Sequence, residues 1–269
     1  MIEFSVRSSR NMTEITHADT IAGLVKGLAV LESFDTERQR LNATQAAQRA
    51  GLTRAAARRH LLTLARIGYL ETDGSFYWLA PRALRLAGAY LASARLPRVI
   101  QPTLNRLAAE TQDVYSAVVL DGDEVVIIAR SAGLAGPATR LLAYGMHLGA
   151  RLPAHATSTG RVLLAALPPA VRAEWLGARP LPRLTPHTTT DPAAFLAVLE
   201  AVARDDHCIA SEEHELGVLA VAVPLRNAQG STVAALNVIV PPHRDSPEPL
   251  ATQHLPRLRA AARDLREML

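Results

Sequence analysis

The sequence has one cysteine, no long apolar run and no apolar segment at its start, and each shortage excludes a kind of protein. Cys208 alone can form neither an intrachain disulfide framework nor a cysteine-based zinc site, which fits a reducing compartment. No apolar run approaches the roughly 20 residues that a membrane-spanning helix needs. Residues 1–12 are mixed and polar and lack the apolar core of a secretory signal. We therefore expect a cytoplasmic protein with no membrane partner.

Apolar residues are otherwise plentiful, and the charges are unevenly spread. Apolar residues make up 49% of the 269 positions and charged residues 20%, which is enough for two globular domains. Residues 1–95 carry 13 basic and 8 acidic residues, whereas residues 96–269 carry 16 and 17. Seven arginines and no acidic residue occur between Arg38 and Leu70. Such a run is usually a solvated basic face, but a DNA-binding motif at the same place favours phosphate contact.

Three helices are predicted in this basic part of the chain. Apolar residues recur at helical spacing from Leu24 to Phe34, which indicates a first amphipathic helix. Asn42 can cap a second helix over residues 43–50, and Thr53 can cap a third over residues 54–67.

A hairpin and a further helix follow. Two short strands, Tyr69–Glu71 and Phe76–Leu79, flank Asp73-Gly74, a residue pair that favours a tight hairpin turn. Three helices and a hairpin are typical of a winged helix-turn-helix. Pro81 then suits the first position of a linker helix that runs to about residue 95.

The third predicted helix would read DNA, because the second helix of a helix-turn-helix enters the major groove. Its side opposite the apolar residues carries several arginines. Arginine can bond guanine through two nitrogens or neutralise a phosphate, and both roles stay open. For the threonines near helix starts, simple capping is the alternative to phosphate contact. The predicted DNA contacts are Thr44, Thr53, Arg54, Ala55, Arg58 and Arg59, with Gly74 and Ser75 at the wing tip.

Beyond residue 97 the pattern changes to hairpins that alternate with helices. Pro97 and Pro102 interrupt the helical pattern before a predicted helix at residues 103–110. Apolar strands flank Asp121-Gly122-Asp123 and Asn227-Ala228-Gln229-Gly230. Further helices are predicted at about residues 157–167, 192–204 and 248–269, and Pro-rich loops at 180–186 and 241–249. This alternation predicts an α+β domain with an antiparallel sheet.

A family pattern is carried by the segments Val25–Phe34, Gly51–Leu64, Gly68-Tyr69, Tyr77–Arg82, Leu152–Ala165, Glu213–Gly217 and Ala222–Pro224. These segments resemble the IclR family of bacterial transcription regulators between residues 20 and 245. Within that family they are most similar to the PcaR/PcaU/PobR subgroup, which governs breakdown of aromatic acids. Asp206-His207-Cys208 departs from the pattern, which usually has Gly-Tyr near this place, and this segment is expected to border the effector pocket.

The resemblance implies a GAF-like effector domain and regulation of an aromatic-acid catabolic operon. The expected organisation is an N-terminal tail (1–19), a winged helix-turn-helix (20–80), a linker helix (81–96) and the effector domain (97–269). The expected partners are double-stranded DNA with a palindromic operator, a small aromatic or related carboxylate, and further copies of the chain in a dimer or tetramer. A regulator of another carboxylate or sugar-acid pathway is the alternative.

A carboxylate effector needs an arginine, or hydroxyls and N–H donors at a helix start. The segment Thr157-Ser158-Thr159 supplies such a start, with His155 before it. The resemblance adds positions on the following strands, where polar Asn237 stands in an apolar run. Asn237 either makes a structural bond to the backbone or contacts the ligand. The predicted effector residues are His155, Thr157, Ser158, Thr159, Ser211 (or Ala210), Val218, Ala220 and Asn237.

Other readings of these residues are weaker. Arg130, Arg140 and Arg151 are lesser candidates, because arginines lie mostly at the surface. His155 and Ser158 could suggest a hydrolase, but no Gly-x-Ser-x-Gly motif surrounds the serine. His207 with residues 212–215 could suggest a metal site, but the spacing is not that of a zinc protease and a solvated acidic loop is favoured. We therefore expect no enzyme, no metal and no cofactor.

Overall fold

The structure is a computed structural model that describes residues 19–35, 38–131, 146–240 and 250–269. The described chain divides into two compact units, and the boundary along the chain lies between Ser93 and Ala94. Of the predicted tail, residues 1–18 lie outside the described residues, and so does the predicted loop at 241–249. Each unit is described below by itself.

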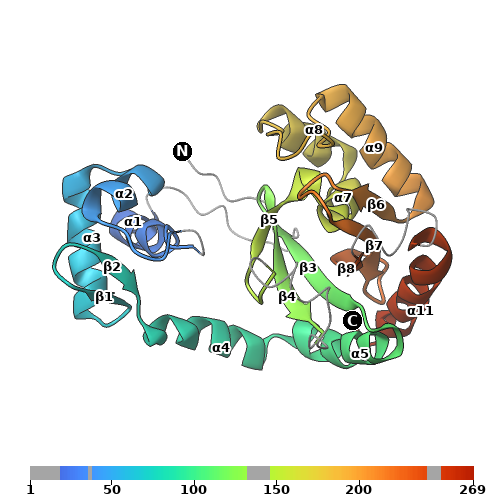
Figure 1. The fold of residues 1–269 in the computed structure, drawn as a ribbon, viewed down its shortest axis with the longest axis horizontal. Coiled ribbons are helices and arrows are strands. Elements are labelled where there is room, and N and C mark those ends of the chain that lie inside the picture. The colour runs from blue at the N-terminus through green and yellow to red at the C-terminus, as the bar shows by residue number, and fades with distance from the viewer. Residues whose placement is uncertain (1–18, 36–37, 132–145, 241–249) are drawn as a thin grey trace. The chain divides into compact units, whose positions relative to one another are not determined.

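The N-terminal unit has the predicted three helices and hairpin (Figure 1). Asn42 accepts hydrogen bonds from the backbone N–H groups of Thr44 and Gln45, and Gln45 bonds back to Asn42, which completes a capping box. The hairpin strands pair in antiparallel register, with Leu70 opposite Leu79. The elements are α1 (Ala22–Leu31), α2 (Ala43–Arg49), α3 (Arg54–Arg66), β1 (Leu70–Thr72) and β2 (Tyr77–Leu79).

Part of the apolar surface of this unit faces outward. Helix α1 forms as predicted, but it buries Val30, whereas Leu24 is 60% exposed and Leu28 45% exposed. The linker segment forms a short 3-10 turn (Pro81–Ala83) and then α4 (Leu84–Ser93), a helix with no buried residue. Leucines on α1 and α4 therefore offer apolar surface that the described chain does not itself cover.

The prediction that Pro97 and Pro102 break the helix is wrong. Helix α5 runs from Arg95 to Thr111 through both prolines. Pro97 is in the first turn, where a backbone N–H would have no partner within the helix. Pro102 removes one internal hydrogen bond, but Ile100, Leu104 and Leu107 on the same helix are buried. Burial of this apolar face outweighs the lost hydrogen bond.

The C-terminal unit contains one antiparallel sheet of six strands in the order β5-β4-β3-β8-β7-β6. The two predicted hairpins, β3 with β4 and β7 with β8, both form. They join through pairing of β3 with β8, which places Ser116 opposite Asn237. The strands are β3 (Val114–Asp121), β4 (Glu124–Arg130), β5 (Arg151–Pro153), β6 (Cys208–Ser211), β7 (Leu219–Arg226) and β8 (Thr232–Val240).

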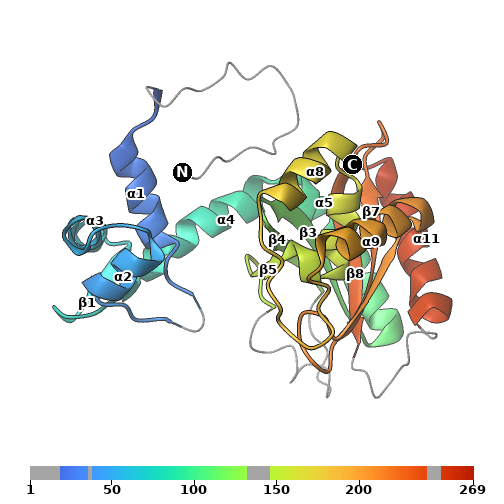
Figure 2. The ribbon, with the colours of Figure 1, turned by 90° about the horizontal axis from the view of Figure 1, so that it is seen from above.

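Helices cover both faces of this sheet (Figures 1 and 2). Helix α5 and helix α11 (Leu255–Arg266), which a short π-helical stretch precedes, pack on one face and form one apolar core. Helices α7 (Ser158–Ala165), α8 (Pro169–Gly177) and α9 (Pro192–Asp205) form a second core on the other face. Strands β5 and β6 were not predicted, because each offers too few residues for a clear period, and helix α8 was not predicted either. No helix of the described residues is long and apolar enough to cross a membrane.

Gly160 lets α7 approach the 3-10 turn Ala154–Ala156 closely. A Cβ atom added at Gly160 would lie 2.1 Å from the carbonyl oxygen of Ala154 and 2.4 Å from its Cα atom. These are backbone atoms, so the clash would force α7 and the turn apart. Because α7 also carries the predicted effector hydroxyls, this contact fixes where those hydroxyls stand.

We expect Gly160→Ala to lower the free energy of unfolding of the C-terminal unit by about 1–3 kcal/mol or more, through overpacking. The matched control is Gly177→Ala at the end of α8, where an added Cβ meets nothing within 4 Å. That control should be neutral or stabilising by up to about 1 kcal/mol. Urea unfolding followed by circular dichroism measures both. Equal stabilities of the two variants would contradict the close approach.

Candidate functional site

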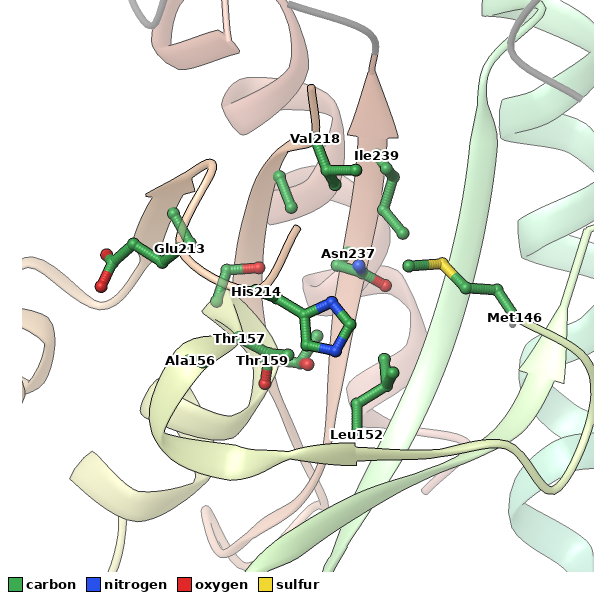
Figure 3. A pocket seen from close by; sticks show the side chains of 13 residues that line it. Met146, Leu152, Ala156, Thr157, Thr159, Glu213, His214, Val218, Asn237 and Ile239 are labelled. Carbon is green, nitrogen blue, oxygen red and sulfur yellow. The ribbon is translucent and has the colours of Figure 1, made fainter. Parts of the chain in front are cut away.

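One pocket opens on the α7 side of the sheet, between the start of α7 and the strands β6, β7 and β8 (Figure 3). It encloses about 410 Å³ of empty space, part of it open to solvent. Most of its wall is apolar, and its polar groups come from the helix start, from Asn237 and from the loop with Glu213 and His214. The lining residues are Met146, Leu152, Ala156, Thr157, Ser158, Thr159, Ala210, Glu213, His214, Val218, Ala220, Asn237 and Ile239.

The start of α7 brings the three predicted hydroxyl residues to the pocket. Thr157 caps the helix, because its Oγ1 accepts a hydrogen bond from the backbone N–H of Gly160 at 3.1 Å. The same hydroxyl donates to the carbonyl oxygen of Pro153 at 3.2 Å. Ser158 and Thr159 are buried beside it. The first turn of a helix has N–H groups without internal partners, so this end of the pocket suits a negatively charged or polar ligand group.

Asn237 lies on the floor of the pocket in the middle of β8 and is only 5% exposed. Its Oδ1 accepts a hydrogen bond of 2.8 Å from the Ser116 hydroxyl on the neighbouring strand. Asn237 thus has the structural hydrogen-bond partner that the sequence predicts, but this partner is the Ser116 side chain and not a backbone group. Because this bond fixes the amide oxygen, the amide nitrogen can present its N–H donors to the pocket.

Two predicted effector residues lie outside the pocket lining. His155 is buried in the turn before α7, but its Nε2 atom bonds the carbonyl oxygen of Pro182 at 3.0 Å. Burial lowers the pKa of His155 below its ordinary value. Ser211 is exposed at the end of β6, whereas its neighbour Ala210 lines the pocket. Alternation of side chains along a strand explains this difference, since adjacent residues point to opposite faces.

Of the three arginine candidates, the two in the described residues, Arg130 and Arg151, also lie outside the lining. Arg151 sits at the surface, where it pairs with Asp121 at 2.8 Å and with Glu124 at 2.6 Å. Arg130 ends β4 and is half-buried, and burial lowers the pKa of its guanidinium. Arg140 lies outside the described residues.

No residue of the segment that departs from the family pattern, Asp206-His207-Cys208, is part of the pocket lining. Asp206 ends α9 in the left-handed conformation, with φ of 57°, a place where glycine is the usual residue. Its carboxylate pairs with Arg226 at 2.5 Å, and this bond and charge lower the pKa of Asp206. The departure therefore has a local structural role at a helix end.

The loop at residues 212–215, expected to be solvated, is so only in part: Glu215 is exposed, whereas Glu213 is tied to a buried arginine. The Arg161 side chain on α7 is 3% exposed and holds both carboxylate oxygens of Glu213. Glu213 also accepts bonds from the N–H and hydroxyl of Thr189, at 3.1 and 3.0 Å. Burial alone would raise the pKa of Glu213, but Arg161 and Thr189 outweigh it and hold that pKa below its ordinary value.

This anchored loop carries His214 into the pocket. Neither Glu213 nor His214 was predicted from the sequence as a pocket residue. Burial lowers the pKa of His214, and His155 adds a smaller effect in the same direction, while Glu215 opposes them. A sequence signal existed: Arg161 stands in an apolar helical run, and a buried charge needs a partner. Among the family segments of the C-terminal half, only Glu213–Gly217 contains acidic residues, namely Glu213 and Glu215.

In the N-terminal unit, the predicted DNA-reading side chains of α3 are exposed. Arg54, Ala55, Arg58 and Arg59 all face solvent, on the side opposite buried Ala57 and Leu61. Thr53 caps α3 through a bond from the N–H of Ala56, and Thr44 is exposed in the first turn of α2. At the wing tip, Gly74 and Ser75 are exposed within a turn that Asp73 holds through the N–H groups of residues 75 and 76.

The arginine run divides into paired and unpaired side chains. Arg40 pairs with Asp73 at 2.6 Å and lies over the Trp78 ring, and Arg49 pairs with Asp35. Among the ion pairs of the described residues, none involves Arg54, Arg58 or Arg59. The positive charge of α3 is therefore concentrated and available to an anionic partner.

Comparison with known proteins agrees with this arrangement. The family model for the IclR helix-turn-helix domain matches residues 23–74, and the model for the bacterial transcriptional regulator IclR C-terminal domain matches residues 88–267. The chain is 53% identical to the p-hydroxybenzoate hydroxylase transcriptional activator of Acinetobacter baylyi, over 95% of this chain and 94% of that protein. It is 49% identical to the Pca operon regulatory protein of the same organism, over 98% and 95%.

Two similar solved structures contain aromatic acids. One is the inducer-binding domain of a double mutant of the PobR transcription factor from Acinetobacter, in complex with 3-hydroxybenzoic acid. It shares 52% identity with a TM-score of 0.61, over 64% of this chain and 98% of that chain. The other is an IclR homologue from Microbacterium hydrocarbonoxydans complexed with 4-hydroxybenzoate, with 30% identity and a TM-score of 0.67, over 90% and 96%. The chain therefore belongs to the IclR family of bacterial transcription regulators.

Proposed function

We propose that this chain controls an aromatic-acid catabolic operon by binding a small aromatic carboxylate in its C-terminal unit and a palindromic operator with its N-terminal unit. The observation that carries the proposal is the pocket itself, a mostly apolar cavity whose polar groups come from a helix start, from Asn237 and from the loop with Glu213 and His214. A mostly apolar lining with a few convergent polar groups is typical of a small-molecule site. It suits a ligand with a single ring and a polar substituent.

The lining favours an aromatic acid over a sugar acid. Met146, Leu152, Val218 and Ile239 present apolar surface that a benzene ring can contact. A sugar acid carries hydroxyls around its whole skeleton, and this wall would leave several of them without hydrogen-bond partners. Relatives at 49–53% identity carry the names of regulators of p-hydroxybenzoate hydroxylase and of the Pca operon, which supports the same class.

A hydrolase is disfavoured by the surroundings of Ser158. The nearest sequence candidate for a general base, His155, has its Nε2 atom bonded to the carbonyl oxygen of Pro182. A nucleophilic serine needs a base within hydrogen-bond reach. Among the described residues no group of three or more His, Cys, Asp or Glu side chains could hold a metal ion. We propose a regulator without enzymatic activity that acts in the cytoplasm, where the chromosomal operator lies.

We further propose that the working form is at least a dimer. A palindromic operator presents two half-sites, and a two-fold protein contacts both. The exposed leucines of α1 and α4, such as Leu24, Leu84 and Leu86, supply apolar surface for such pairing.

Specific DNA binding should depend on the unpaired arginines of α3. We expect Arg58→Ala and Arg59→Ala each to weaken operator binding by about 1–3 kcal/mol if the side chain reads a base. A side chain that contacts a phosphate should instead lower the salt dependence of binding by about one unit of slope. Fluorescence anisotropy with labelled operator at several salt concentrations separates the two roles.

The matched control removes an exposed arginine elsewhere. Arg106→Ala on α5 deletes the same charge, and Arg106 makes only a 3.2 Å surface pair with Glu110. This variant should keep the parental affinity and salt slope. If both α3 variants also behave like the parent at every salt concentration, α3 is not the DNA-reading helix.

Effector binding should depend on Asn237. We expect Asn237→Ala to weaken binding of 4-hydroxybenzoate about tenfold or more, because a buried hydrogen bond to a charged ligand is worth about 1.5–3 kcal/mol. Isothermal titration calorimetry measures the affinity. Asn105→Ala is the control, since Asn105 is an exposed amide on α5 that only accepts a bond from Gln101. Unchanged affinity in Asn237→Ala would remove this residue from the site.

A further inference from the structure

We infer that His214 is the group that meets the carboxylate of the effector, and that binding therefore draws a proton onto its imidazole ring. The inference rests on the proposed function, because it concerns the same pocket and the same class of ligand. It adds a consequence that the aromatic-acid assignment does not contain: the affinity for effector depends on pH, and the protein takes up protons when it binds.

The geometry places this ring inside the cavity. Figure 3 shows the imidazole of His214 extending from the loop between β6 and β7 into the pocket, on the side lined by Thr159, Leu152 and Asn237. Neutral donors at the start of α7 thus share the cavity with the imidazole. A carboxylate that bonds the hydroxyls of α7 can at the same time be approached by the imidazole nitrogen.

Among the described lining residues, His214 is the group able to balance an anion. Among the described lining residues only Glu213 and His214 ionise. The Glu213 carboxylate is already held by Arg161 and Thr189, and in Figure 3 it points away from the middle of the pocket. A ligand carboxylate that loses its water in this cavity is costly unless a positive group compensates it. A protonated His214 supplies that charge.

The surroundings of His214 in the protein disfavour the protonated form of its ring. Burial lowers the pKa of His214 below its ordinary value, and the neighbouring His155 acts in the same direction. Glu215 is the opposing neighbour. Glu213 and Arg161 face this region as a mutually neutralised pair. His155 does not compete for the role, because burial lowers its own pKa and its Nε2 atom is bonded to Pro182.

A bound carboxylate reverses this balance. An opposite charge within about 4–6 Å favours the protonated ring and raises its pKa. At pH values between the lowered pKa of His214 in the free protein and its raised pKa in the complex, binding is accompanied by proton uptake. In that range the affinity falls as the pH rises, by up to about tenfold per pH unit for one proton. The opposite arrangement, with a neutral His214 bonded to the hydroxyl of the ligand, takes up no proton.

The decisive experiment is calorimetry of the full chain with 4-hydroxybenzoate at one pH near 7.5 in phosphate, HEPES and Tris buffers, whose ionisation enthalpies differ. The dependence of the observed enthalpy on the buffer enthalpy gives the number of protons taken up. We expect a clear uptake in the parent, approaching one proton, and an affinity that weakens as the pH is raised. Binding of the neutral analogue 4-hydroxybenzamide should be accompanied by no proton uptake.

Two variants identify the side chain that takes up the proton. His214→Gln should bind more weakly and lose the uptake, whereas His187→Gln should leave both unchanged. His187 is a matched surface control, because its side chain is 56% exposed and lies 3.7 Å from Glu212. The buffer series on the parent tests the proton uptake even if His214→Gln does not fold.

The outcomes separate this inference from the proposal that it rests on. Binding of 4-hydroxybenzoate without proton uptake overturns the inference and leaves the proposed function intact. Undiminished uptake in a folded His214→Gln variant also overturns it, because the proton then belongs to another group. No binding of 4-hydroxybenzoate, 3-hydroxybenzoate or protocatechuate by the parent would contradict the proposed ligand class and the inference with it.

Discussion

The buried pair between Arg161 and Glu213 is the contact on which the geometry of the pocket depends. Arg161 is on the helix that presents the three hydroxyl residues, and Glu213 is in the loop that presents His214. The Nε atom of the same arginine donates to the carbonyl oxygen of His155 at 2.8 Å, so the turn before the helix is held as well. One guanidinium thus joins the three segments that supply most of the polar lining.

The surroundings of this pair explain why it can persist away from water. Two buried charges stabilise a fold only when their remaining hydrogen-bonding capacity is satisfied, and removal of one partner typically costs about 3–5 kcal/mol. Thr189 satisfies the carboxylate, while Thr185 and Thr188 bond the carbonyl oxygens of residues 212 and 213 at 2.7 Å each. The loop is therefore fixed from both sides, and the imidazole of His214 enters the cavity from a rigid support.

In the N-terminal unit, by contrast, several arginines are exposed and make no ion pair among the described residues. There, acidic side chains neutralise Arg40 and Arg49 beside the wing and α2, and the arginines of α3 keep their charge for a partner. A regulator needs both arrangements. In the proposed function, fixed and buried groups of the pocket discriminate between similar small acids, whereas the exposed charge of α3 attracts phosphates over a distance. An effector can alter DNA binding only if it binds the two functional states with different affinities.

Local patterns in the sequence were sufficient for most of the fold. The caps at Asn42 and Thr53, the Asp-Gly turns and the exposed arginines of α3 follow from interactions between residues close in the chain, so periodicity and turn chemistry predicted them. The hydroxyls at the start of α7 were found in the same way. The sequence pattern predicted a helix break at Pro97 and Pro102 that does not occur in α5. Burial of Ile100 and Leu104, which depends on distant parts of the chain, outweighs the hydrogen bond lost at proline.

The rest of the site was decided by tertiary structure alone. Asn237 was recognised as unusual, but its bond to Ser116 joins residues 121 positions apart, and only the register of β3 and β8 brings them together. Arg161 and Glu213 are separated by 52 positions, and neither side chain reveals its partner locally. The sequence by itself determined most of the longer elements and which surface is basic, because those properties arise within a few turns of chain. Which polar groups share one cavity was decided by strand order and helix packing, because long-range contacts leave no period in the sequence.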